Sequence, residues 1–184
     1  MPSPSKAKGS AWERDVAEHL TNIFGLNHSR VPNSGAFTGR SNSFRLNTLT
    51  PAQQLLMVGD IIMPEQLSKY CIECKFYKEF QFHHLFEDNL LLDKWIEQSR
   101  VSTRCWFIIF KANRTGGFVV YDPNNQAPVT PHTNYMSYKG LVLTKLDGFF
   151  EKNKDVMLKY NQEGVCQSQI QNSTLTTLSS ISSS

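Results

Sequence analysis

Residues 58–76 read VGDIIMPEQLSKYCIECKF, and the pattern of this stretch decides the fold. Two segments rich in isoleucine, valine and aromatic residues flank a polar link that contains Pro64. This arrangement predicts two strands, at 57–63 and 69–76, joined as a hairpin. Each predicted strand carries an acidic side chain in apolar surroundings, so the hairpin is also where we expect a functional site.

The charged side chains of these two strands include Asp60, Glu73 and Lys75. Side chains alternate between the faces of a strand, so Glu73 and Lys75 project together, away from the side chain of Cys74. Two carboxylates and an amine at the mouth of a hairpin suit a divalent cation beside a phosphate, as in a metal-dependent phosphodiesterase. Asp60 needs such a partner, because an unpaired carboxylate in a buried strand is costly. An exposed Glu–Lys pair is the alternative explanation for the second strand.

Phosphodiester hydrolysis needs an activated water and stabilisation of negative charge on phosphorus, which oxygen-ligated Mg²⁺ supplies. We expect Asp60 and Glu73 to bind the ion, with the backbone carbonyl of Cys74 within its reach. Lys75 would steady the attacking water or the developing charge. Glu13, in the first turn of a predicted helix, would complete the acidic set if that helix packs across the sheet.

The composition is that of a globular protein: 184 residues, 40% hydrophobic and 19% charged, enough for one domain and a tail. The net charge of +3 says little about which partners the protein binds. Residues 25–50 carry Arg30, Arg40 and Arg45 but no acid, which is compatible with a phosphate backbone as partner. A solvated basic surface is the alternative. With no apolar signal segment and no run of roughly 20 apolar residues, we expect a soluble, intracellular protein.

The spacing Cys71-x-x-Cys74 raises the question of a zinc or redox site. Alternation along one strand puts these two side chains on opposite faces. The sequence also lacks a second cysteine pair at ligand spacing, which zinc sites usually need. We therefore expect buried, reduced thiols, as is usual in an intracellular protein.

Periodicity and turn residues predict alternating helices and strands along the rest of the chain. We expect helices at 11–24, 51–56, 84–101 and 145–159, with Ser10 capping the first and Thr144 the last. We expect further strands at 28–31, 104–111, 117–122 and 140–143, and loops at 32–49 and 123–138. Interspersed strands and helices indicate an α/β fold, with a mixed sheet flanked by helices.

The order Asp60, a gap, then Glu73-x-Lys75 resembles the signature of the PD-(D/E)xK nuclease superfamily. Further pieces, taken in order, resemble the archaeal-type Holliday junction resolvases within it. These pieces are KGSAWERD at 8–15, Arg30, NSG at 33–35, GDII at 59–62, IECK at 72–75, Gln98 and the strand at 106–111.

The resemblance implies a restriction-endonuclease-like core and a DNA endonuclease that cleaves Holliday junctions or other branched DNA, in recombination or repair. It implies Mg²⁺ as cofactor, with Mn²⁺ as a substitute, and a homodimer, since two strands of a junction are cut symmetrically. It assigns metal binding to Glu13, Asp60 and Glu73, and catalysis to these residues together with Lys75. The expected DNA contacts are Lys8, Arg30, Ser34, Arg40, Arg45 and Gln98.

The nuclease domain would span 10–160, after a flexible basic arm at 1–9 and before a disordered Ser/Thr/Gln-rich tail at 161–184. Residues 36–56 look like an insertion whose arginine and phenylalanine residues either touch DNA or decorate the surface. The chain after residue 111 matches no part of the resolvase pattern. The alternatives are a restriction-type, repair or DNA-end-processing nuclease on the same fold, or a DNA-binding protein without turnover.

Overall fold

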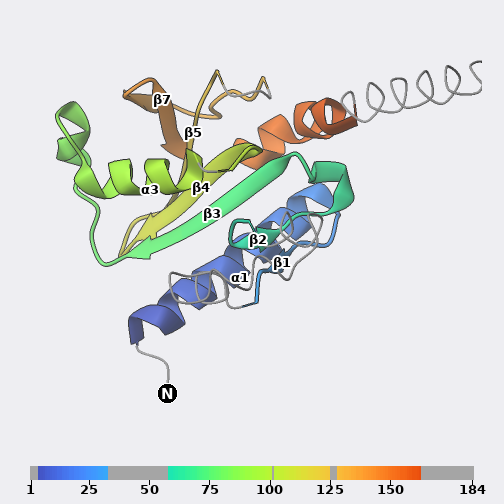
Figure 1. Cartoon of the computed structure of the whole chain (residues 1–184), viewed down its shortest axis with the longest axis horizontal. Coiled ribbons are helices and arrows are strands. Elements are labelled where there is room, and N and C mark those ends of the chain that lie inside the picture. The colour runs from blue at the N-terminus through green and yellow to red at the C-terminus, as the bar shows by residue number, and fades with distance from the viewer. Residues whose placement is uncertain (1–3, 33–57, 101, 125–127, 163–184) are drawn as a thin grey trace, which may run out of the picture.

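The computed structural model describes residues 4–32, 58–100, 102–124 and 128–162. Its centre is a five-stranded sheet in the order β3-β4-β5-β7-β6, with helices on both faces (Figure 1). The strands of this sheet are β3 (Tyr70–Tyr77), β4 (Cys105–Ala112), β5 (Gly117–Tyr121), β6 (Tyr135–Tyr138) and β7 (Leu141–Lys145). The helices are α1 (Pro4–Phe24), α3 (Leu90–Arg100) and a helical stretch at 149–162. The short elements are β1 (Ser29–Arg30), β2 (Ile61–Ile62) and the 3₁₀ turns η2 (Glu65–Leu67) and η3 (Phe82–Phe86).

β3 and β4 run parallel, and the other neighbouring pairs in the main sheet are antiparallel. A parallel pair requires a crossover connection, and the segment from η3 through α3 supplies it. The β6–β7 hairpin turns through Lys139 and Gly140, which both have positive φ, as a tight turn of this kind requires. The fold is therefore α/β, with a mixed sheet between helices, as the sequence predicts.

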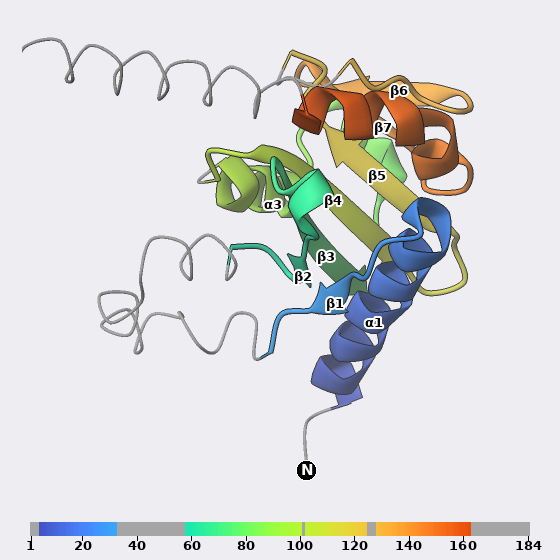
Figure 2. The ribbon, with the colours of Figure 1, turned by 90° about the vertical axis from the view of Figure 1, so that its right-hand side faces the viewer.

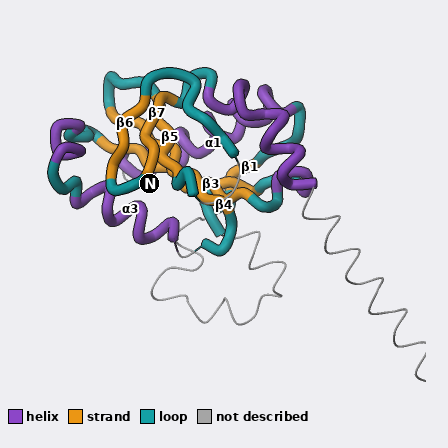
Figure 3. Tube along the Cα trace, turned by 90° about the horizontal axis from the view of Figure 1, so that it is seen from above, coloured by secondary structure: helices purple, strands orange, loops and turns teal. Residues whose placement is uncertain are grey.

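Apolar residues form a core on each face of the sheet. The first core joins α1 and the helix at 149–162 to the sheet, where Phe107 of β4 contacts the ring of Phe149. These two helices share one face (Figure 2), whereas α3 covers the opposite face (Figure 3). The second core lies under α3 and η3, where the ring of Trp95 packs against Phe110.

The two cysteines of the CxxC spacing belong to different cores. Cys71 packs under α3, while Cys74 packs under α1. This confirms that their side chains lie on opposite faces of β3. Both thiols are buried, and neither forms a disulfide.

α1 begins at Pro4, earlier than the predicted start at 11. Residues 4–9, predicted as part of a flexible arm, form its first turns, and Ser10 lies inside the helix rather than at its cap. Proline is favoured at the first helical position, and the lysine and alanine residues that follow are good helix formers. The helix therefore continues across Gly9 and Ser10, although these two residues look like a helix start in the sequence.

The prediction of a hairpin is wrong in its pairing. The first strand is reduced to β2, which pairs antiparallel with β1, the strand predicted at 28–31. β3 forms one edge of the main sheet and receives a hydrogen bond from the Asp60 N–H at its Ile72 carbonyl, 2.8 Å away. Gly59, with a φ of +90°, turns the chain just before β2, so residues 58–63 do not run as one regular strand.

The C-terminal half departs from the prediction in two places. β6 lies inside 123–138, predicted as a loop, because pairing with β7 stabilises a short strand that has no clear apolar pattern. β7 continues to Lys145, and the last helix begins at 149. Thr144 is therefore a strand residue and not a helix cap. Gly148, with a φ of +73°, separates the strand from the helix.

α3 begins at Leu90 instead of 84, because η3 occupies the first part of the predicted helix. Several predictions lie outside the described residues: the loop at 32–49 beyond its first residue, the helix at 51–56, the insertion at 36–56 and the tail after 162. Within the described part of the chain, no helix is long and apolar enough to cross a membrane.

Candidate active site

Asp60 lies at the edge of β3, where hydrogen bonds fix both its backbone and its side chain. Its N–H donates to the Ile72 carbonyl at 2.8 Å, and its own carbonyl accepts the N–H of Val31 at 2.9 Å. The backbone N–H of Cys74 donates to Oδ2 of the Asp60 carboxylate at 2.8 Å. The carboxylate is therefore held beside the strand that carries Glu73.

Glu73 and Lys75 lie on the same face of β3, as the alternation of side chains predicts. The Lys75 ammonium donates to Oε2 of Glu73 at 3.0 Å and to Oε1 of Gln98 at 3.1 Å. Gln98, near the end of α3, also donates from Nε2 to Oε2 of Glu73 at 3.4 Å. Glu73 is only 9% exposed, so this carboxyl group is almost withdrawn from water.

The carboxyl group of Asp60 is close enough to perturb that of Glu73. Burial raises the pKa of Glu73, and the Asp60 carboxylate raises it further, against the opposing effect of the Lys75 ammonium. For Lys75, burial acts to lower the pKa, but the charges of Glu73 and Asp60 outweigh this and hold the pKa above its ordinary value. The site thus has more negative charge than the lysine compensates.

These groups match the ligands that a hard divalent cation prefers. Asp60 and Glu73 offer carboxylate oxygens next to each other, and Mg²⁺ and similar ions favour oxygen ligands. The carbonyl of Cys74 faces the same edge of β3, because the N–H and C=O of a strand residue point the same way and this N–H reaches Asp60. A cation here would offset the repulsion that raises the pKa of Glu73.

The described residues contain no group of three or more His, Cys, Asp and Glu side chains arranged to hold a metal. An ion bound between Asp60 and Glu73 would therefore complete its coordination with backbone, water or phosphate oxygens. Mg²⁺ commonly binds in this way, through one or two carboxylates plus waters and substrate phosphates. The residues present thus fit a metal site in which two carboxylates hold the ion and water or phosphate oxygens complete its coordination.

Glu13 does not join the other two acids. It lies on α1, where its carboxylate forms a salt bridge with Arg30 of β1. Its charge still adds to the effects of burial and of Asp60 that raise the pKa of the Cys74 thiol, so it lies near this part of β3. The assignment of Glu13 as a third metal ligand stays a prediction.

The residues assigned to DNA binding have different surroundings. Lys8 is exposed on α1, with its ammonium 6.0 Å from the centre of the Phe76 ring. Arg30 is engaged in its salt bridge, and Gln98 contacts Lys75 inside the site. The DNA-binding candidates outside the described residues are Ser34, Arg40 and Arg45.

Two further basic residues, which are not among the predicted site residues, lie close to these elements. Arg104, just before β4, donates from Nη2 to the Val58 carbonyl at 2.7 Å, two residues before Asp60. Lys111, near the end of β4, lies 5.2 Å from the centre of the Trp12 ring on α1. No sequence pattern links positions 104 and 58, because the two segments meet only when α3 and β4 are packed.

Comparison with known proteins gives a matching family and a similar protein. Residues 4–159 match a protein family described as "Phage putative PDDEXK endonuclease". Protein D14 of Escherichia phage T5 is 33% identical over 165 residues, which cover 82% of this chain and 92% of that protein. No significant match was found among solved structures. The stretch that matches the family contains Glu13, Asp60, Glu73 and Lys75.

Proposed function

The chain belongs to the family of phage PDDEXK endonucleases, and we propose that it hydrolyses phosphodiester bonds in DNA with a divalent metal ion at Asp60 and Glu73. The observation that carries this proposal is the close pairing of the two carboxyl groups beside the Lys75 ammonium, at one edge of the sheet. Two acids repel a phosphate diester unless a cation lies between them. The site therefore suits DNA only when a metal is bound.

Mg²⁺, or Mn²⁺ in its place, would activate a water molecule and neutralise charge on the phosphate when bound. Asp60 and Glu73 would hold the ion through carboxylate oxygens, and Cys74 would add its backbone carbonyl. Lys75 offers N–H donors and a positive charge that orient the attacking water or contact a phosphate oxygen. Gln98 restrains the ammonium through its hydrogen bond.

Cleavage of DNA in Mg²⁺ by Asp60→Asn, Glu73→Gln and Lys75→Met tests these roles. Each variant should bind DNA but cut it at least about a hundredfold more slowly, the usual cost of removing a charge-stabilising group. Glu13→Gln belongs to the same series as the test of a third ligand. Glu151→Gln removes an exposed acid on the helix at 149–162 and should cut at the wild-type rate. A wild-type rate for Asp60→Asn would overturn the proposal.

For the substrate, we propose branched DNA such as a four-way junction. The support is the ordered set of sequence pieces that resemble archaeal-type resolvases, including KGSAWERD at 8–15 and NSG at 33–35. The test compares a synthetic four-way junction with linear duplex of the same sequence in Mg²⁺, and the junction should be cut preferentially. Equal or faster cutting of the linear duplex would favour a restriction-type, repair or end-processing nuclease.

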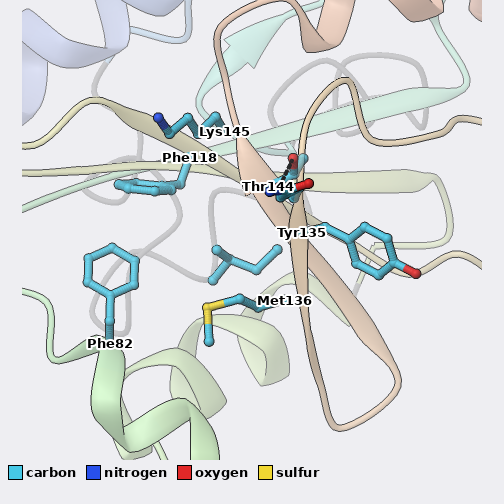
Figure 4. A pocket seen from close by; sticks show the side chains of 8 residues that line it. Phe82, Phe118, Tyr135, Met136, Thr144 and Lys145 are labelled. Carbon is cyan, nitrogen blue, oxygen red and sulfur yellow. Dashed lines mark hydrogen bonds between the residues drawn. The ribbon is translucent and has the colours of Figure 1, made fainter.

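We also propose a homodimer, because a junction is cut on two strands. An apolar surface near η3 supports it: Phe86 and Leu90 are 84% and 80% exposed. η3 also contributes Phe82 to a cavity of about 440 Å³, lined in addition by Phe118 and Met136 (Figure 4). A second copy, related by a twofold axis, would bury both the exposed side chains and the cavity.

Charges near this apolar surface favour a second copy over DNA as its partner. Glu87 directly follows Phe86, is exposed and would repel phosphate, whereas the exposed Lys145 lines the cavity and carries the opposite charge. The cavity borders β6, at the opposite edge of the sheet from β3, so a dimer formed there leaves both sites open.

Light scattering after gel filtration should give twice the mass of one chain. Glu87→Lys and Lys145→Glu should each weaken the dimer, and the double variant should restore it, because the charges are then exchanged rather than lost. A wild-type protein that stays monomeric at every concentration would contradict the proposed dimer without affecting the metal site.

A further inference from the structure

The position of Asp60 depends on residues 58–60, a bend that belongs to neither the main sheet nor a helix. Val58 begins this bend, and its carbonyl accepts a hydrogen bond from Nη2 of Arg104 at 2.7 Å. Arg104 directly precedes β4, an inner strand of the sheet. The hydrogen bond therefore ties the segment that carries Asp60 to the start of that inner strand.

The backbone between Val58 and Asp60 has little room to move, because Gly59 packs closely against β3. A Cβ atom at this position would lie 2.8 Å from the Ile72 carbonyl oxygen and 2.9 Å from Sγ of Cys71, so the backbone packs directly on β3. The Cys71 thiol also approaches the Val58 carbonyl, with its Sγ 3.7 Å from the oxygen. If the Val58 carbonyl moves, the backbone of Asp60 should therefore move with it, because only Gly59 separates the two residues.

Arg104 is poorly arranged for a residue that only stabilises the fold. It takes part in none of the salt bridges among the described residues. Its Nε is buried without a hydrogen-bond partner in the described structure, and such a group costs stability. What the guanidinium does hold is the Val58 carbonyl, two residues from a proposed metal ligand.

We infer that Arg104 is a positioning residue that keeps the Asp60 carboxylate where it can share a metal ion with Glu73, an inference that rests on the proposed nuclease function. Without the guanidinium, the Val58–Gly59 peptide loses this anchor, and Asp60 moves more freely relative to Glu73. Residues that orient a metal ligand without touching the metal typically change metal affinity by about 10- to 100-fold. The effect of Arg104 belongs to metal affinity and not to the chemical step.

Isothermal titration of the full chain with Mn²⁺ alone tests this role. Arg104→Met removes the donors but keeps an aliphatic stem, and its Kd for Mn²⁺ should be about tenfold weaker than that of the wild type. Its cleavage at low Mn²⁺ should fall by a similar factor and return toward the wild-type rate as Mn²⁺ is raised. A general structural defect would not be rescued in this way. Arg104→Lys, which keeps the charge and a donor, should recover part of the affinity.

The matched control is Arg100→Met, which removes an exposed arginine from the nearby end of α3 and should bind Mn²⁺ like the wild type. Asp60→Asn separates the two proposals: if it binds Mn²⁺ as tightly as the wild type, the proposed metal site is wrong. If Asp60→Asn loses Mn²⁺ binding while Arg104→Met retains wild-type affinity, the metal site stands and the positioning role is wrong. Should Arg104→Met fail to fold, Arg104→Gln replaces it with the same expected loss, because glutamine is too short to reach Val58.

Discussion

Gly59 should matter both for the stability of the protein and for the position of Asp60. Its φ of +90° is unfavourable for other residues, and a side chain would meet the backbone of β3. Gly59→Ala should lower the free energy of unfolding by about 2–5 kcal/mol, from the left-handed conformation and from overpacking together. It should also slow cleavage, because Asp60 is displaced. Urea unfolding and a cleavage assay measure the two effects.

Gly25→Ala is the matched control for this substitution. Gly25 also has a positive φ, of +68°, but nothing lies within 4 Å of its Cβ position. The control should lose only about 1–2 kcal/mol and cut DNA at the wild-type rate. Equal losses of stability in the two variants, with full cleavage in both, would contradict the role of Gly59.

His28 should make the stability of the protein depend on pH. Its ring is buried, Nδ1–H donates to the Leu26 carbonyl at 2.8 Å, and Nε2 has no partner in the described structure. Burial lowers the pKa of His28 below its ordinary value of 6.5, against the opposing effect of the hydrogen bond. Between the two pKa values the unfolded chain binds more protons, so the free energy of unfolding falls as the pH drops below about 6.5.

The substitution His28→Phe should flatten this dependence below about pH 6.5, as measured by urea unfolding at each pH. A phenyl ring can take the place of the imidazole, which already packs against Phe24 at 5.8 Å between ring centres. His83→Gln, at an exposed position on η3, should keep the wild-type slope. A full wild-type slope in His28→Phe would mean that the dependence has another source.

Among the elements, β3 and β4 follow from the sequence, whereas β2 and β6 do not, and the reason is physical. β3 and β4 are long and mostly buried, so their own composition determines them. β6 has two exposed residues among its four and depends on pairing with β7. β2 is short because Gly59 bends onto β3, a contact made only in the folded chain. Boundaries and pairings of this kind are set by tertiary packing, which local patterns do not encode.

The N-terminus of α3 is fixed by side chains from two elements. Oδ1 of Asn89 accepts the N–H of Leu92 at 3.0 Å, which caps the helix. The hydroxyl of Tyr138, on β6, accepts the Asn89 N–H at 2.8 Å and donates to Oδ1 of Asp93 at 2.9 Å. The strand missed by the sequence thus supports the helix whose other end carries Gln98.

Asn89→Ala should lower the free energy of unfolding by about 1 kcal/mol, because it removes the cap of α3. The affinity for Mn²⁺ should not change, since Trp95 and Ile96 keep the later turns of the helix packed in the core. Asn124→Ala, at an exposed loop position, should leave both quantities unchanged. An affinity loss in Asn89→Ala as large as its stability loss would show that the whole helix shifts.

At the scale of the whole molecule, the site forms where β2, β3 and α3 meet at one edge of the sheet, with α1 nearby. The proximity of Glu73 and Lys75 was predictable from alternation on one strand, and Asp60 stood out as a carboxylate in an otherwise apolar segment. Two hydrogen bonds arise from packing between separate elements: that from Lys75 to Gln98 and that from Arg104 to the Val58 carbonyl. For these contacts the sequence contains no local signal.

Metal binding and folding should be linked across the whole molecule. A ligand that binds only the folded chain stabilises it by about 2.7 kcal/mol when its free concentration is a hundred times its Kd. Urea unfolding in Mn²⁺ should therefore show a gain of this size over unfolding in EDTA. Asp60→Asn should abolish the gain and raise the stability in EDTA, because it removes the carboxylate whose proximity raises the pKa of Glu73. Glu151→Gln should keep the full response, and a metal response in Asp60→Asn equal to that of the wild type would exclude Asp60 as a ligand.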